Sequence, residues 1–367
     1  MQRTTGIKLQ TVGVITLAWI LFSTLLFFFE YTSYQYRSAE LVDTFNLPLE
    51  FGLTLLSCLL AGIVGGSLLV FNLDRGSKRR PFYFGIISTA LYFLIIYFGI
   101  SAIISLIALS IEQTRPIFSS SVVKAALVDN MFSSFQIRNV LVWTCIVVAT
   151  QFMLQINDRF GPGNLWKIFR AKYHTPKEEL RVFMFLDMKS STSIAEEFGH
   201  KKYYLFLNEF YSVISDTIIN RYGEIYQYVG DEIVISWTAE NAVRDQNCLY
   251  CYFDIRKVIE QNHEIFKSEY KRIPDFRAGI HFGPVTVGEI GNYKRDIVFT
   301  GDVMNTTARI QEACKAYEAD LLISENALSL FDNTHPFAID VLDEIELRGK
   351  EKRVHLYALS LDGAVEG

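Results

Sequence analysis

Hydrophobic residues form two different patterns along the chain. The first 156 residues contain four long apolar stretches without Asp, Glu, Lys or Arg, which are Thr11 to Phe29, Phe51 to Phe71, Phe82 to Ile111 and Val140 to Ile156. A helix needs ~20 mostly apolar residues to cross the hydrocarbon core of a bilayer. The pattern therefore predicts an α-helical domain with four transmembrane helices, of which the third is long enough to tilt and the fourth is short.

Hydrophobic runs after residue 180 are shorter and of two kinds. Runs typical of strands lie at 181–186, 224–229, 232–237, 276–290, around Ile297 and at 321–324, with 276–290 interpreted as a hairpin. Helical periodicity covers 192–222, a long segment ending near Tyr270, and a segment from Asp302. This order predicts a ferredoxin-like α+β domain with a βαββαβ core and helices on one face of the sheet. Gly223 is expected to end the first of these helices in the left-handed conformation.

The predicted organisation is a membrane domain at 1–156, a linker at 157–180, the α+β domain at 181–360 and a C-terminal tail at 361–367. Gly161-Pro162-Gly163 is expected to end any helix that continues from the fourth span. The next segment, Leu165 to Arg170, mixes apolar and basic residues. It fits a helix on the membrane surface or against a second copy of the chain, and it fits an ordinary connecting helix equally well.

Composition and charge assign the two halves to different surroundings. Half of the 367 residues are apolar, which excludes a disordered polymer, and the net charge is +3 before residue 157 and −8 after it. Arg75, Lys78, Arg79 and Arg80 crowd one short loop, so the positive-inside rule predicts that this loop, both termini and the α+β domain are cytoplasmic. The chain is thus expected to be an integral protein of a plasma or inner membrane. The first span is followed by Phe-Phe-Phe-Glu-Tyr, not by small residues, and is not expected to be a cleaved signal peptide.

The five cysteines do not predict a disulfide framework. Cys58 and Cys145 lie in spans, and the other three lie on the reducing side. Cys248-x-x-Cys251 is compatible with a metal site, but the sequence holds no second pair. Their spacing places both thiols on one face of the predicted helix, so we expect them to pack in the core.

Three short segments of the α+β domain carry residues suited to phosphate chemistry. Asp187 ends the first predicted strand, Asp231 lies at the tip of a hairpin, and Asn305 and Arg309 share one face of a helix. The segments Phe185 to Thr192, Tyr228 to Glu232 and Gly301 to Ile310 together resemble the catalytic domain of class III nucleotidyl (adenylate or guanylate) cyclases. The resemblance covers roughly residues 180 to 360, and the spacing of three separate motifs makes it specific.

The resemblance implies a two-metal reaction in which the ribose 3′ oxygen attacks the α-phosphorus of a nucleoside triphosphate. Asp187 and Asp231 match the two metal-binding aspartates of the family, so two Mg²⁺ or Mn²⁺ ions are expected per active site. Backbone N–H groups of the turn between strand and helix are expected to hold triphosphate oxygens. The residues of this turn are Met188, Lys189, Ser190, Ser191 and Thr192.

The same resemblance assigns roles to groups on the helix and near the C-terminus. Asn305 matches the residue that orients the ribose, and Arg309 matches the arginine that stabilises the α-phosphate in the transition state. Arg348 stands where the family has a lysine that contacts the outer phosphates, and Lys350 can share that role. A solvated basic turn fits this segment nearly as well. In the family the metal aspartates and the Asn/Arg pair come from different subunits. A homodimer with two composite sites is therefore expected.

The purine-contacting positions depart from the family pattern. Gln227 stands where adenylate-specific members have Lys, and Val298 stands where they have Asp or Thr. Gln227 still offers hydrogen bonds whereas Val298 offers none, and Asp296 is a substitute if the strand is shifted. The Glu and Cys pair of guanylate-specific members is absent as well. ATP is the favoured substrate, for second-messenger synthesis, with GTP as the alternative.

Other classes of protein fit only parts of the sequence. A diguanylate cyclase needs a Gly-Gly pair where Val229 precedes Gly230, and it leaves Asn305 and Arg309 unexplained. A receptor with a degenerate cyclase domain, acting as a nucleotide sensor or scaffold, fits the unusual purine positions but not the aspartate pair. A transporter is disfavoured because the four spans hold no charged residue, and a P-loop ATPase because no P-loop motif occurs. The expected partners are the nucleotide, the bilayer and a second copy of the chain, with no nucleic acid.

Overall fold

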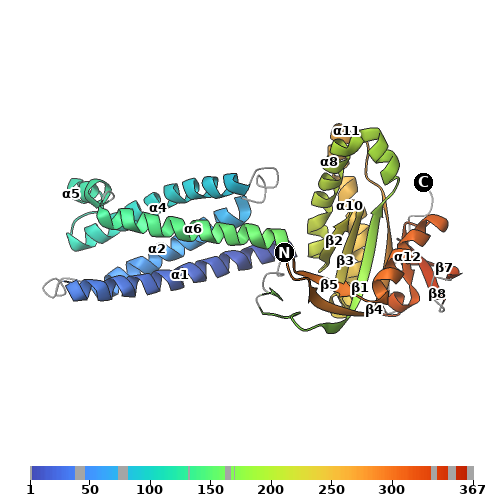
Figure 1. The fold of residues 1–367 in the computed structure, drawn as a ribbon. Helices are drawn as coiled ribbons and strands as arrows, with labels where there is room; N and C mark the ends of the chain where they lie inside the picture. The colour runs from blue at the N-terminus through green and yellow to red at the C-terminus, as the bar shows by residue number, and fades with distance from the viewer. Residues whose placement is uncertain are drawn as a thin grey trace. The chain divides into compact units, whose positions relative to one another are not determined.

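The computed structural model describes residues 2–37, 46–72, 82–130, 133–161, 167–168, 170–331, 337–345 and 353–361. The chain divides into two units, Met1–Pro162 and Gly163–Gly367, which correspond to the two hydrophobic patterns. Figure 1 shows the helical unit in blue to green and the mixed unit in green to red.

The first unit consists of helices. They are α1 (Arg3–Arg37), α2 (Leu47–Ser67) continued by the π-helical η2 (Leu68–Asn72), α4 (Phe82–Glu112), α5 (Ser120–Lys124) continued by η4 (Ala125–Asn130), and α6 (Ser134–Phe160). Four described stretches are long and apolar enough to cross a membrane: Arg3–Ser33, Leu47–Phe71, Tyr83–Ile111 and Gln136–Arg159. These contain most of each predicted span. The basic loop with Arg75 and Lys78 lies outside the described residues.

A few polar side chains join the apolar helices. Trp19 on α1 donates its indole N–H to the hydroxyl of Thr150 on α6 at 3.1 Å. Gln136 on α6 accepts from the Tyr97 hydroxyl at 2.7 Å and donates to Ser101 at 2.8 Å, both on α4. Because lipid supplies no hydrogen bonds, such contacts hold helices together in an apolar medium. As predicted, α6 ends at Phe160, and Gly161 follows with a φ of 84°.

The second unit is built on one mixed sheet. Its strands are β1 (Lys177–Met188), β2 (Glu224–Val229), β3 (Glu232–Thr238), β4 (Phe276–Ile290), β5 (Asp296–Thr300), β6 (Leu321–Ser324), β7 (Phe337–Ile345) and β8 (Val354–Leu361). The order is β2-β3-β1-β4-β6-β8-β7, and β5 pairs with β4. Strands β4 and β6 run parallel, while the other paired strands run antiparallel. The predicted α+β class is confirmed.

Helices cover both faces of this sheet. They are α8 (Ser191–Asn220), α9 (Ala239–Val243), the 3₁₀ turn η5 (Arg244–Gln246), α10 (Asn247–Gln261), α11 (His263–Tyr270), α12 (Asp302–Ala316) and α13 (Glu325–Leu328). Met184 of β1 packs in the cluster formed by α8 and α10. Phe183, its neighbour in the strand, packs in the opposite cluster with Val303 of α12. The prediction of helices on one face only is therefore wrong for α12, because β1 is apolar on both of its sides.

Three local predictions also change. The segment 276–290 is one strand and not a hairpin. Its first part pairs with β6 and its last part with β5, and Pro284 lies between them, where its missing N–H leaves no gap in either pairing. The helix predicted to run to Tyr270 is interrupted at Asn262, whose side-chain amide donates to the Val258 carbonyl at 2.7 Å. Tyr222, with a φ of 60°, takes the left-handed conformation predicted for Gly223.

Candidate functional site

Asp187 and Asp231 come together at one end of the sheet. Asp187 is the next-to-last residue of β1, and its odd-numbered position points it toward the face that α12 covers. Asp231 lies in the two-residue loop between β2 and β3, after Gly230 with a φ of 65°. The register places Glu232 opposite Asp187, so this loop lies beside the end of β1. The two carboxyl groups are near enough for the charge of one to affect the other.

The electrostatics of Asp187 reflect crowded negative charge. Burial raises the pKa of Asp187 to about 6, and the neighbouring Asp231 carboxylate adds to this increase. An amide hydrogen bond from Gln311 and the positive charge of Arg277 act in the opposite direction. A bound cation would relieve the repulsion between the two carboxylates.

Two further charged residues next to these aspartates were missed by the sequence analysis. Burial and the nearby Asp187 and Asp231 raise the pKa of Glu232 to about 7. Arg277 stands opposite Asp187 on β4, and its Nε is buried without a hydrogen-bond partner among the described residues. The only signal for Arg277 in the sequence is its position at the start of an apolar strand.

The donor set of this site fits a hard divalent cation completed by a ligand. Within the described ranges, no group of three or more His, Cys, Asp and Glu side chains forms a closed metal site. Mg²⁺ usually binds through one or two carboxylates and completes its octahedron with water and substrate phosphates. Two carboxylates at a sheet end, beside an arginine with an unused donor, match that arrangement.

The predicted phosphate turn is only partly available. Met188 is buried as the last residue of β1, and the Lys189 backbone N–H already donates to the Asp275 carbonyl at 2.9 Å. The Lys189 ammonium pairs with Asp275 at 3.0 Å and also with Asp320. The N-terminal turn of α8, with Ser191 and Thr192 after the left-handed Ser190, supplies the remaining N–H groups.

A tyrosine on α8 supports the loop that carries Asp231. The Tyr211 hydroxyl donates to the carbonyl oxygen of Gly230 at 3.1 Å. The Tyr211 ring also packs against the Tyr228 ring of β2, with 4.6 Å between centroids. These contacts join α8 to the hairpin and limit the movement of the loop. Helical periodicity placed Tyr211 on α8 but gave no signal for this contact.

Helix α12 presents different residues to different surroundings. Gln311 is 6% exposed and donates from Nε2 to Oδ2 of Asp187 at 3.2 Å. At 100° per residue, Arg309 and Asn305 lie about 160° and about 120° around the helix axis from Gln311. Asn305 is exposed and Arg309 is half-buried. The face that carries Asn305 and Arg309 therefore points away from Asp187 of the same chain.

The two predicted purine positions lie on elements that touch. The backbone N–H of Phe299, next to Val298 on β5, donates to the Tyr226 hydroxyl at 3.3 Å. Tyr226 precedes Gln227 on β2, and the Tyr226 and Phe299 rings are 4.8 Å apart. Gln227 is exposed and Val298 is half-buried.

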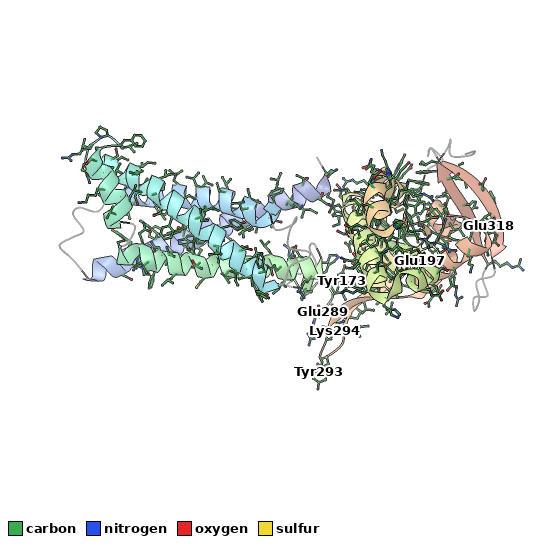
Figure 2. The ribbon with its side chains drawn as sticks, turned by 90° about the horizontal axis from the view of Figure 1, so that it is seen from above. Tyr173, Glu197, Glu289, Tyr293, Lys294 and Glu318 are labelled. Carbon is green, nitrogen blue, oxygen red and sulfur yellow. The ribbon has the colours of Figure 1, made fainter. Side chains whose placement is uncertain are left out.

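The proposed substitute, Asp296, is engaged at the tip of the β4–β5 hairpin. It forms an ion pair with Lys294 at 2.8 Å. Figure 2 shows Lys294 and the fully exposed Tyr293 at the end of this hairpin, with Tyr293 directed away from the sheet. One position before the last pair of the hairpin, the Glu289 backbone N–H donates to the Tyr173 carbonyl at 3.1 Å.

The other residues singled out in the sequence are not part of the described site. Arg348 and Lys350 are outside the described residues. Cys248 and Cys251 are fully buried on α10 in the main core, as the sequence predicts.

Comparisons with known proteins point to one family. The sequence model described as "Adenylate and Guanylate cyclase catalytic domain" matches residues 173–360. The chain is 31% identical over 288 residues to "Adenylate cyclase 2" of Rhizobium meliloti (strain 1021), covering 76% of this chain and 75% of the relative. It is 26% identical over 185 residues to "Adenylate cyclase" of Anabaena cylindrica, covering 48% of this chain and 36% of the relative. Among solved structures, a bacterial light-regulated adenylyl cyclase has the same fold, with a TM-score of 0.53, 16% identity, and coverage of 63% of this chain and 66% of that one.

Proposed function

Because the chain belongs to the adenylate and guanylate cyclase family, that is, the class III nucleotidyl cyclases, we propose that it converts ATP to 3′,5′-cyclic AMP and pyrophosphate at sites shared by two copies of the chain. The orientation of α12 carries the proposal of shared sites. Within one chain, Asn305 and Arg309 point away from Asp187, so they serve the aspartates of a second copy. A head-to-tail twofold pairing then creates two equivalent sites.

Each residue has a task that its position supports. Asp187 and Asp231 hold two divalent cations, Mg²⁺ or Mn²⁺, which lower the pKa of the ribose hydroxyl and neutralise phosphate charge when bound. Arg277 and the N-terminal N–H groups of α8 bind outer phosphate oxygens. Asn305 of the second copy orients the ribose, and Arg309 places its planar guanidinium against the α-phosphate as charge develops there. Arg348 and Lys350 add positive charge near the outer phosphates.

Adenine is the base that we propose for the purine pocket. The relatives that carry this proposal are named adenylate cyclases. The contact between Tyr226 and Phe299 supports a pocket shared by Gln227 and the strand of Val298. The Gln227 amide can both donate to and accept from the base edge. Val298 replaces the polar residue that adenylate-specific members have at this position, so Gln227 is left as the single polar partner of the base. We therefore expect a smaller preference for ATP over GTP than two polar partners would give.

We place both copies in a membrane through their four apolar helices. Arg75, Lys78, Arg79 and Arg80 put the short basic loop, both termini and the catalytic unit on the cytoplasmic side. The catalytic unit then has access to cytoplasmic nucleotides, and the cyclic product acts as a second messenger.

Product analysis tests the reaction. Full-length protein in detergent, given ATP or GTP with Mg²⁺ or Mn²⁺, should yield cyclic AMP as the main product by mass spectrometry. Cyclic GMP as the main product would replace the adenylate assignment by the guanylate one. Nucleotide binding without any cyclic product would favour a nucleotide sensor.

Mixed dimers test the shared sites. Asp187→Ala and Arg309→Ala should each be inactive alone, because each removes a required group from both sites. Co-expression at equal levels should restore about a quarter of the wild-type activity, because half of the dimers are mixed and each mixed dimer rebuilds one of two sites. No recovery in mixed dimers that are shown to be folded and paired would contradict the proposal.

A further inference from the structure

We propose that Gln311 is a positioning residue that fixes the orientation of the metal-binding carboxylate of Asp187 in its own chain. This inference rests on the proposed function, since it concerns the site where Asp187 acts. Its evidence is the contact between α12 and the end of β1.

The side chain of Gln311 is buried and hydrogen-bonded, which limits the conformations it can adopt. It is 6% exposed and lies on the face of α12 that packs on the sheet, between the buried Thr307 and Cys314. Its Nε2 donates to Oδ2 of Asp187 at 3.2 Å. A buried amide that lost this partner would leave an unsatisfied donor, so the bond is expected to persist in the folded protein.

The position of α12 against the sheet is set by a glycine. A Cβ atom at Gly279 of β4 would lie 2.4 Å from the backbone nitrogen of Gln311 and 2.9 Å from the Ile310 carbonyl carbon. The helix thus approaches the strand as closely as backbone atoms allow, which brings the Gln311 side chain within reach of Asp187. Because both elements are rigid, the amide holds one carboxylate oxygen at a fixed place.

The chemistry of the pair supports a positioning role. A carboxylate has two oxygens and about four lone-pair sites, so Oδ2 can accept from Gln311 while Oδ1 remains open to a cation. The donor on Oδ2 opposes rotation of the Asp187 carboxylate about its side-chain bond, so Oδ1 keeps one direction. Hydrogen bonds of this kind to metal-binding side chains typically change metal affinity by about 10- to 100-fold.

Metal binding without turnover tests the proposal. Full-length protein is titrated with Mn²⁺ in the presence of 3′-deoxy-ATP, which lacks the attacking hydroxyl, and unbound Mn²⁺ is measured by electron paramagnetic resonance. Gln311→Met keeps the length of the side chain but removes the donor, and it should weaken Mn²⁺ binding about tenfold. Thr307→Val is the matched control, because the Thr307 hydroxyl on the same helix face donates to the Val303 carbonyl within α12, at 2.7 Å. Mn²⁺ binding by Gln311→Met that equals wild type, or an equal loss in Thr307→Val, would overturn the proposal.

Mixed dimers separate positioning from helix packing. A dimer of one Asp187→Ala chain and one Arg309→Ala chain, purified through two different affinity tags, has one rebuilt site, whose Asp187 belongs to the Arg309→Ala chain. Gln311→Met placed in that chain should raise the Mn²⁺ concentration for half-maximal activity about tenfold. The same substitution in the Asp187→Ala chain should leave it unchanged, although the folding cost is the same.

The outcomes distinguish this proposal from the one on which it rests. If Gln311→Met raises the Mn²⁺ concentration for half-maximal activity equally in either chain, Gln311 acts through the packing of α12 and a positioning role is refuted. If the substitution has no effect in either chain, a positioning role is refuted as well. If the reference mixed dimer is inactive, the shared sites are refuted. The Mn²⁺ titration then still decides the role of Gln311.

Discussion

Replacing Arg181 by methionine removes the positive centre of a buried ion network in the catalytic unit. The Arg181 side chain is 1% exposed, and it pairs with Glu179 at 2.8 Å and with Glu224 at 3.1 Å. Its guanidinium also stacks over the Phe299 ring, 4.8 Å from the centroid. Glu224 also pairs with Lys167, which precedes β1 in the chain, at 3.1 Å. The network therefore joins the segment before β1 to β1, β2 and β5.

The cost of Arg181→Met follows from these contacts. Removing one partner of a buried ion pair typically destabilises a protein by about 3–5 kcal/mol. Glu224 is 38% exposed and keeps Lys167, so we expect the lower end, about 3 kcal/mol. For a unit of about 200 residues, 1 kcal/mol corresponds to roughly 2–4 °C, which gives a decrease in Tm of about 6–12 °C.

The assay is thermal unfolding of the full chain in detergent, followed by tryptophan fluorescence. Trp237 is buried on β3, and its indole N–H donates to the Arg221 carbonyl at 2.8 Å, so its emission reports on the catalytic unit. The triple variant Arg181→Met, Glu179→Gln, Glu224→Gln is the control. It should lose less stability than Arg181→Met alone, because it also removes the two partly buried negative charges that Arg181 compensates.

The pH dependence provides a second check on the same network. Burial alone raises the pKa of Glu179 and Glu224, but Arg181 together with nearby lysines outweighs it and lowers both pKa values. Carboxylates with a lowered folded-state pKa contribute stability above the unfolded-state pKa of about 4.5 and lose it as the pH falls toward the folded-state value. The Tm difference between wild type and Arg181→Met should be complete at pH 7 and shrink below pH about 4.5. A difference under about 2 °C at pH 7, or one that grows in acid, would refute the reasoning.

Two further predictions concern packing. Gly279→Ala places a Cβ atom 2.4 Å from the Gln311 backbone nitrogen and should destabilise the catalytic unit by about 1–3 kcal/mol. In Gly283→Ala the new Cβ atom lies at an ordinary 3.4 Å from Val303, so this variant should lose less stability. Equal Tm values for the two variants would contradict this prediction. Burial raises the pKa of Cys248 to about 12 and raises that of Cys251 as well, so neither thiol should react with iodoacetamide at pH 8 until the protein is unfolded. Mass spectrometry of the labelled peptides checks this, and rapid labelling of the native protein would show that α10 packs differently.

Periodicity and local chemistry in the sequence determined the two-part organisation and most elements. Long uncharged runs predict membrane-spanning helices. Shorter apolar runs predict the strands, with Asp187 near the end of one and Asp231 in the loop between two others. The spacing of Asn305 and Arg309 on one helix also follows from the sequence alone, because residues four apart share a face. These features depend on neighbours along the chain.

Contacts between distant segments were decided only by the tertiary structure. No local pattern distinguishes Gln311 from a solvent-facing glutamine, and its bond to Asp187 exists because Gly279 lets α12 approach the sheet. The same holds for Arg277, which stands opposite Asp187 through strand register, and for Lys189, whose N–H is used by the Asp275 carbonyl. Sequence patterns report the period of a helix or strand, but they carry no information on which partner fills the space on its buried side.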